Sequence, residues 1–162
     1  MWSVEFEIML SESYNISSYT NLFHVTTGEK GGPEFGNMGS RYPAIFVTAD
    51  VPKLQFNTDL SGMQNHNFKH ASLLLSDTEW TKVSMKQHEI NGAIFLTITV
   101  NDQIVHQIEN TQPRSFGNMF VYSAHPWHDV GNVYIINLRY TTSPCNFFVD
   151  NYYLITPKYY LK

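Results

Sequence analysis

The sequence predicts an all-β protein, a sandwich of two antiparallel sheets built from a single domain over residues 1–162. Several segments alternate apolar and polar side chains with a period of two, which is typical of half-buried strands. Asn-Gly and Asn-Asp pairs interrupt this alternation where hairpin turns would fall. Aromatic residues make up 15% of the chain, and such residues favour pleated, half-buried surfaces. No segment shows a sustained helical period with caps.

The first predicted strand is WSVEFEIML, residues 2–10. Its alternation places an apolar set on one face, namely Trp2, Val4, Phe6, Ile8 and Leu10. Ser3, Glu5 and Glu7 share the opposite face. The segments AIFV (44–47) and KLQF (53–56) are shorter candidates. We expect Trp2 in the core, and also Trp80, which stands at the start of a predicted central strand.

Residues 80–108 predict a three-stranded antiparallel meander. Asn91-Gly92 joins its first two strands, because both residues tolerate positive φ. Asn101-Asp102 joins the second strand to the third. The inward face of the middle strand carries Ile94, Leu96, Ile98 and Val100, and Phe95, Thr97 and Thr99 face outward.

Three later segments, 118–124, 133–141 and 147–155, complete the expected strands. The glycine-rich segment 27–40 is a predicted long loop, and loops of this length inside compact domains often carry function. It lacks the spacing of a phosphate-binding loop.

Composition excludes several classes of function. The net charge is −4 with a pI near 5.9 and no Lys/Arg cluster, so we expect no nucleic-acid partner. No run of about 18 apolar residues predicts a membrane span. The single cysteine, Cys145, excludes an internal disulfide and a cysteine-rich zinc site. A lone cysteine is usually a small buried hydrophobe.

The chain carries no signal-peptide pattern, which leaves an intracellular protein or an excised domain of a longer one. The tripeptide Asn15-Ile16-Ser17 is the only glycosylation sequon, and it favours the secretory route.

Segments WSVEFEI, EWTKVSM and IFLTITVNDQIVH, in this order, resemble the concanavalin A-like lectin and glucanase superfamily, with its laminin-G and pentraxin-like jelly rolls. More narrowly, the chain resembles modules in extracellular proteins of marine invertebrates. The resemblance covers residues 2–140, and residues 145–162 follow as a C-terminal strand extension. Ser40 departs from the pattern, because such modules carry an acidic residue before the Arg of GSRYPA. The cysteines that they often carry in the middle strands are also missing.

The resemblance implies a non-catalytic extracellular binding or adhesion module that recognises glycan through rim loops and a concave sheet. The alternative is a structural module for protein–protein assembly within a larger secreted or cell-surface protein, through edge strands and the tyrosine-rich residues 145–162. The superfamily's hydrolases carry Glu-x-Asp-x-x-Glu on one strand, and that string is absent here. Glu5 and Glu7 alternate with a regular apolar face, which is typical of a solvated strand surface. We therefore expect no enzyme activity.

Glycan recognition needs an aromatic face for the sugar ring and polar groups for its hydroxyls. The loop SAHPWHD offers Trp127 together with His125, His128 and Asp129. The segment GSRYP offers Arg41 and Tyr42 beside the glycine-rich loop. A tryptophan in such a loop can equally plug one end of the sandwich, so both interpretations stay open.

We expect no cofactor, and calcium is the ion with the best candidate ligands. Asp129 and Asn132 in one loop and Asn101-Asp102 in a turn supply the oxygen ligands that calcium prefers. These residues are also ordinary turn formers. His125 and His128 lack an evident third ligand for zinc. His106 is in register with Ile104 and Ile108, so we expect a half-buried, hydrogen-bonded ring rather than a ligand.

Overall fold

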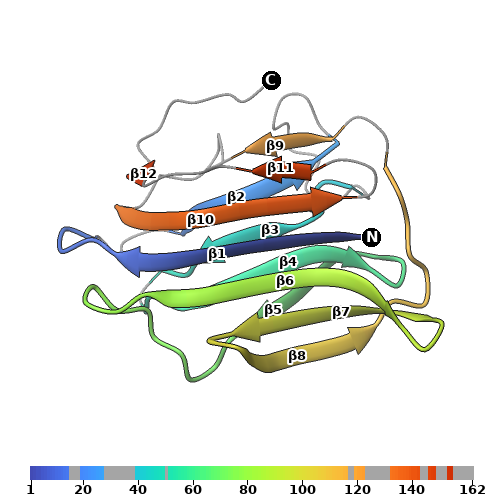
Figure 1. The fold of residues 1–162 in the computed structure, drawn as a ribbon, viewed down its shortest axis with the longest axis horizontal. Helices are drawn as coiled ribbons and strands as arrows, with labels where there is room; N and C mark the ends of the chain where they lie inside the picture. Colours follow the sequence, from blue (N-terminus) through green and yellow to red (C-terminus); the bar gives the residue numbers. More distant parts are fainter. Residues whose placement is uncertain are drawn as a thin grey trace.

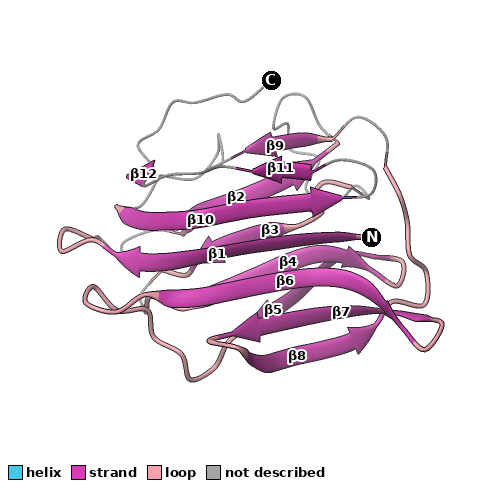
Figure 2. Ribbon diagram, in the orientation of Figure 1, coloured by secondary structure: helices cyan, strands magenta, loops and turns pink. Residues whose placement is uncertain are grey.

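The computed structural model describes residues 1–14, 19–27, 39–49, 51–116, 119–122, 132–142, 146–148 and 153–154. These residues form twelve strands, and Figure 2 shows strands joined by loops and turns. No helix in this part of the chain is long and apolar enough to cross a membrane.

One sheet has seven strands in the order β11-β10-β1-β6-β7-β8, and β12 also pairs with β10. The strands are β1 (Trp2–Leu10), β6 (Thr81–Ile90), β7 (Ala93–Val100), β8 (Gln103–Glu109), β10 (Val133–Thr142), β11 (Asn146–Phe148) and β12 (Tyr153–Leu154). All pairings are antiparallel. The predicted last strand is thus two short strands, both on β10.

The other sheet has five strands in the order β5-β4-β3-β2-β9, again all antiparallel. Its strands are β2 (Thr20–Thr26), β3 (Ala44–Val47), β4 (Leu54–Leu60), β5 (Met63–Lys69) and β9 (Phe120–Tyr122). Figure 1 shows this sheet lying behind the seven-stranded one. The predicted two-sheet sandwich is confirmed.

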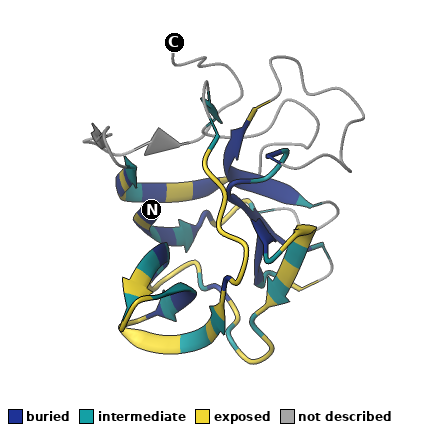
Figure 3. Ribbon diagram, turned by 90° about the vertical axis from the view of Figure 1, so that its right-hand side faces the viewer, coloured by how far each residue is buried: buried dark blue, intermediate teal, exposed yellow. Residues whose placement is uncertain are grey.

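The core lies between the two sheets and follows the period of two. Along β1 every second residue, from Trp2 to Leu10, is buried. The largest fully buried side chains come from both sheets and include Phe23, Phe56, Leu96 and Ile98. In Figure 3 the buried residues lie mainly on the central strands, and much of the exposed surface lies on the loops and outlying strands.

The predicted meander is confirmed by the pairing of β6 with β7 and of β7 with β8. Asn91 and Gly92 have φ values of 53° and 85°, and Asn101 and Asp102 of 48° and 63°. Positive φ at both central residues gives the turn that matches strand twist.

The expectation that Trp80 lies in the core is wrong, because its side chain is 36% exposed. Thr81, Val83 and Met85 are buried along β6. In this alternation Trp80 therefore lies on the same face as the exposed Lys82, and not on the buried face. Trp2 is 4% exposed, as predicted.

Candidate functional site

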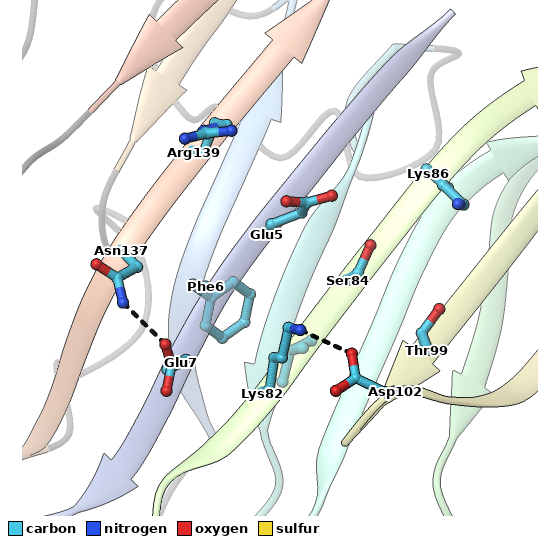
Figure 4. A pocket seen from close by; sticks show the side chains of 11 residues that line it. Glu5, Phe6, Glu7, Lys82, Ser84, Lys86, Thr99, Asp102, Asn137 and Arg139 are labelled. Carbon is cyan, nitrogen blue, oxygen red and sulfur yellow. Dashed lines mark hydrogen bonds and ion pairs between the residues drawn. The ribbon is translucent and has the colours of Figure 1, made fainter.

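A groove of about 410 Å³ lies on the outer face of the seven-stranded sheet. Its walls come from β10, β1, β6 and β7 and from the turn after β7 (Figure 4). The lining side chains are Glu5, Phe6, Glu7, Lys82, Val83, Ser84, Lys86, Thr99, Asp102, Asn137 and Arg139. All of these except Phe6 and Val83 are charged or polar, so the groove is a polar surface above an apolar core.

Strand register arranges these side chains in rows across the sheet. Glu5 lies opposite Arg139 of β10 on one side and opposite Ser84 of β6 on the other. Ser84 in turn lies opposite Thr99 of β7. Directly opposed residues of antiparallel strands project from the same face. The sequence therefore folds into a row that runs Arg139, Glu5, Ser84, Thr99.

A second row begins at a β-bulge in β10. The register shifts between Glu5 and Glu7, because two residues of β10 instead of one lie opposite Phe6. Asn137 at this bulge has a φ of 56°, and its Nδ2 donates to Oε1 of Glu7 over 2.8 Å. Bulges re-aim side chains and are common beside functional sites. This one aims an amide into the groove (Figure 4).

Glu7 lies opposite Lys82 of β6, which makes an ion pair of 2.7 Å with Asp102. The hydrogen bond from Lys82 and the charge of Asp102 raise the pKa of Lys82. Asn101 Oδ1 also accepts from the Lys82 backbone N–H over 2.9 Å. The predicted calcium oxygens of Asn101 and Asp102 are therefore engaged as turn and ion-pair groups.

The groove is electrostatically balanced. Its carboxylates are Glu5, Glu7 and Asp102, and its cations are Lys82, Lys86 and Arg139. Three negative and three positive groups give no formal net charge. The groove thus offers hydrogen-bond acceptors and donors in alternation. Its electrostatic field does not favour ligands of either charge.

A second polar group lies at the predicted candidates Arg41 and Tyr42. Tyr42 is 7% exposed, and its ring packs edge-on against Trp2 and Phe116 with centroids 5.6 and 5.0 Å away. Its hydroxyl donates to the Arg114 carbonyl over 2.6 Å and accepts from Gln87 Nε2 over 3.3 Å. Tyr42 is built into the core in this structure.

Asp59 on β4 is the buried carboxylate facing Arg41. It is 3% exposed, and it accepts a hydrogen bond from the Gly39 backbone N–H. Burial raises the pKa of Asp59 to about 6, while the Gly39 N–H and the charges of Arg114 and Arg41 act in the opposite direction. Asp59 thus supplies a carboxylate beside Arg41, although residue 40 is a serine.

Asp59 belongs to a layer of polar side chains buried in the five-stranded sheet. Ala44 and Phe46 of β3 lie opposite Asn57 and Gln55 of β4. Gln55 donates to Asn57 over 2.8 Å, and Asn57 donates to Asn65 over 2.7 Å. Gln55 and Asn57 are buried, whereas Asn65 on β5 is exposed, so most of this hydrogen-bonded chain of amides is out of contact with solvent, in contrast to the open groove.

Several predicted site residues lie outside the described part of the chain. These are Trp127, His125, His128, Asp129, the sequon residue Asn15, and Cys145. Asn132 is described, and its Nδ2 donates to Ser13 Oγ over 3.0 Å. Among the described residues no group of three or more His, Cys, Asp or Glu could hold a metal ion.

The sequence predicts that Glu5 and Glu7 lie on a solvated face, and no pattern in it indicates the groove. Part of the groove could be predicted, because the alternation along residues 2–10 places the polar side chains on one face of the strand. Recognising a site required the partners Arg139 and Asn137, which join β1 only through long-range pairing.

One solved structure similar to this chain is the Botulinum Neurotoxin Type G Receptor Binding Domain. The TM-score is 0.54 at 7% identity, over 86% of this chain and 34% of that chain. The chain thus spans about a third of the length of that structure. At this identity the likeness shows the β-sandwich fold alone. No family model and no curated protein matches the chain.

Proposed function

We propose that this chain is a non-catalytic binding module of the concanavalin A-like jelly-roll type that recognises glycan. The observation that carries the proposal is the polar groove on the outer face of the seven-stranded sheet. Sugar hydroxyls both donate and accept hydrogen bonds. Alternating carboxylates, amides and cations can pair with several hydroxyls of one ligand.

Glu7 and Asn137 form the centre of the proposed site. Asn137 donates to one oxygen of Glu7, which holds the carboxylate in place and leaves acceptor capacity on both side chains. A side chain held by its neighbours loses less conformational freedom when a ligand binds. The loop residues Trp127, His125, His128 and Asp129 remain predicted rim groups that would add an aromatic face.

The resemblance to extracellular modules supports a location outside the cell, as part of a secreted or cell-surface protein. The similar solved structure is titled a receptor-binding domain, which is consistent with a binding role on this type of sandwich. Peptide mapping after expression through a secretory pathway tests whether the Asn15 sequon is accepted for glycosylation, as this location requires.

The experiment that tests the glycan proposal is a glycan array probed with the purified chain, with and without calcium. A selective hit is then measured in solution with Glu7→Gln and with the control Glu109→Gln, an exposed residue on β8 outside the groove. Loss of a charge-assisted hydrogen bond should weaken binding roughly 10- to 100-fold in Glu7→Gln only. A blank array, or equal affinities of the two variants, contradicts the proposal.

A glycan that binds the chain can also be used to test whether the groove hydrolyses it. Glu5 and Glu7 are the carboxylates that a glycoside hydrolase would need in this groove. We expect no new reducing ends after long incubation of the bound glycan with the chain. Hydrolysis that disappears in Glu5→Gln would make the groove an active site instead.

The alternative function is protein–protein assembly. Part of the tyrosine-rich stretch 145–162 pairs within the chain, because β11 and β12 add to β10. Assembly predicts that the mass in solution rises with protein concentration and that deletion of residues 145–162 abolishes this rise. The glycan proposal predicts a constant mass.

A further inference from the structure

Two histidines from different sheets meet at one side of the sandwich. His66 lies on β5, at the edge of the five-stranded sheet, and His106 lies on β8, at the edge of the seven-stranded sheet. Figure 1 shows both strands at the same side of the molecule. The two Nε2 atoms are 3.1 Å apart, and both side chains are half-buried. This arrangement confirms the prediction of a half-buried, hydrogen-bonded ring for His106.

The two rings meet end to end through these nitrogens. Their centroids are 5.3 Å apart and their planes differ by 18°. The centroid separation exceeds the Nε2–Nε2 distance of 3.1 Å by about one ring width, so each Nε2 points at the other. The hydrogen bond therefore requires one Nε2 to carry a proton and the other to present its lone pair.

Phe68 holds the pair against the core. Its ring lies parallel to that of His106, with centroids 4.4 Å apart and planes within 15°. Phe68 also contacts Phe56, a fully buried core residue, with centroids 6.2 Å apart. The pair thus closes the side of the core at which the edges of the two sheets meet.

The other titratable side chains of the surrounding strands do not place a counter-charge against the pair. Asp59 of β4 accepts a hydrogen bond from a backbone N–H of the preceding loop, and Lys69 of β5 donates to the Tyr19 hydroxyl over 3.1 Å. Glu109 of β8 lies opposite Phe95, on the outer face of its sheet. Strand β7 carries no titratable residue.

His70, which follows β5, is the remaining titratable group beside the pair. Its ring meets Phe68 edge-on, with centroids 6.4 Å apart, and its Nδ1 accepts from the Leu73 backbone N–H over 3.0 Å. Burial lowers the pKa of His66, and burial together with the charge of His66 lowers the pKa of His106. Both effects favour the neutral rings.

The number of protons on the pair decides whether the hydrogen bond can exist. With both rings neutral, one Nε2–H donates to the lone pair of the other Nε2. One further proton leaves a charged and a neutral ring, and the bond remains. A second further proton places N–H groups on both Nε2 atoms and two like charges on rings whose nitrogens are 3.1 Å apart. The closed pair therefore accepts one further proton at most.

We propose that His66 and His106 form a pH-sensitive clasp, which joins β5 to β8 at neutral pH and releases them on acidification. A histidine titrates ordinarily at a pKa of about 6.5. Below this pH both rings of the unfolded chain take up a proton, whereas the closed pair takes up fewer. The stability that the clasp contributes is therefore complete above about pH 7, and it is lost as the pH falls below about 6.5.

The clasp goes beyond the proposed glycan site, because the groove shares no residue with it. Release frees the edge strands of both sheets, and most residues of these two strands are exposed already. It also removes the ring contact that covers Phe68. Acidification should therefore loosen this side of the sandwich and leave the central strands in place.

The test is a double-mutant cycle in the full chain, with His66→Phe, His106→Phe and the double variant. Phenylalanine keeps an aromatic ring and cannot form the hydrogen bond. Urea denaturation from pH 4.5 to 8 measures the coupling, and the cycle cancels contributions of other titrating groups. At pH 8 we expect a coupling of about 2- to 10-fold in the unfolding equilibrium constant, as for one neutral hydrogen bond. It should vanish or reverse by pH 5.

His88 provides the matched control. Its Nε2 lies 2.9 Å from Thr97 Oγ1, and it lies opposite Phe95 on the outer face of the same sheet as His106. The cycle of His88→Phe with His106→Phe should show no coupling at any pH. A coupling of His66 to His106 that does not change with pH overturns the proposal, as does the absence of coupling at pH 8.

A second readout uses the wild-type chain and covers the case in which a variant fails to fold. Nuclear magnetic resonance of ¹⁵N-labelled histidine reports which ring nitrogen carries each proton. At pH 8 one ring of the pair should be protonated at Nε2 and the other at Nδ1, and protons should be taken up in two separate steps. Backbone amides of β5 and β8 should lose protection from hydrogen exchange at the second step, whereas those of β1 keep it. Titration of both rings together near pH 6.5 with unchanged protection overturns the proposal.

Discussion

The side-chain amide of Asn137 donates a 2.8 Å hydrogen bond to the carboxylate of Glu7 from a bulge in β10. The bond joins two strands that are separated by most of the chain. It orients an acidic group over the centre of the outer sheet face, and it depends on a backbone conformation that few side chains adopt. Asn is among the residues that tolerate this conformation.

Asn137 is therefore a position where backbone strain and side-chain function can be separated. Its φ of 56° is left-handed, which disfavours most residues by about 1–2 kcal/mol and leaves glycine unaffected. We expect Asn137→Ala to be about 1 kcal/mol less stable than Asn137→Gly in urea denaturation. Both variants should bind the glycan more weakly, because Glu7 loses its donor. Equal stability of the two variants would mean that the bulge rearranges.

Asp59 should give the protein an unusual dependence of stability on pH. Its pKa is about 6 in the folded chain against 3.8 ordinarily, so the folded state holds a proton that the unfolded state releases between about pH 4 and 6. The contribution of Asp59 is present below about pH 4 and is lost as the pH rises through about 6. Relative to Asp59→Asn, the wild type should lose about 2 kcal/mol between pH 4 and pH 7. Urea denaturation of both proteins from pH 4 to 7 measures the difference, and parallel curves would contradict the assignment.

Tyr42→Phe tests whether Tyr42 stabilises the fold or binds ligand. The variant removes a hydroxyl that donates to the Arg114 carbonyl and accepts from Gln87. Leaving these groups without their partner should cost about 1–3 kcal/mol of stability. Glycan affinity at a temperature well below melting should not change. A loss of affinity with unchanged stability would instead make Tyr42 the ligand-binding residue that the sequence predicted.

The two faces of the meander should respond differently to truncation. Leu96 on β7 is fully buried, and Ile104 on β8 is 62% exposed. Leu96→Ala should lower the free energy of unfolding by about 2–5 kcal/mol because it leaves a cavity. Ile104→Ala should change it by less than about 0.5 kcal/mol. Chemical denaturation measures both, and a large effect at Ile104 would indicate that its exposed side chain packs against another molecule.

Prediction from sequence succeeded where alternation and turn chemistry agree. The β1 pattern and the meander β6-β7-β8 carry a local signal, because pleat and hairpin are properties of neighbouring residues. β5 was missed because MQNHNFK is polar on both faces, as an edge strand with little buried surface can be. β2 was missed for the opposite reason, since all seven of its residues are buried and its sequence mixes polar and apolar side chains without alternation.

The site was less predictable than the fold. Arg139 and Glu5 become neighbours through the pairing of β10 with β1, and no local pattern encodes that contact. The polar layer in the five-stranded sheet is equally hidden, because Gln55 and Asn57 have the composition of a solvent-facing strand surface. Their burial depends on what the rest of the fold places around them.

The position of β1 also bears on how the protein is made. This strand comes first in the sequence, and it lies in the interior of its sheet between β6 and β10. During synthesis β6 becomes available once residue 90 has left the ribosome, whereas β10 begins only at residue 133. In that interval one edge of β1 offers unpaired backbone groups to other nascent chains. Translation speed across residues 91–132 thus sets how long the growing chain is exposed to misassembly.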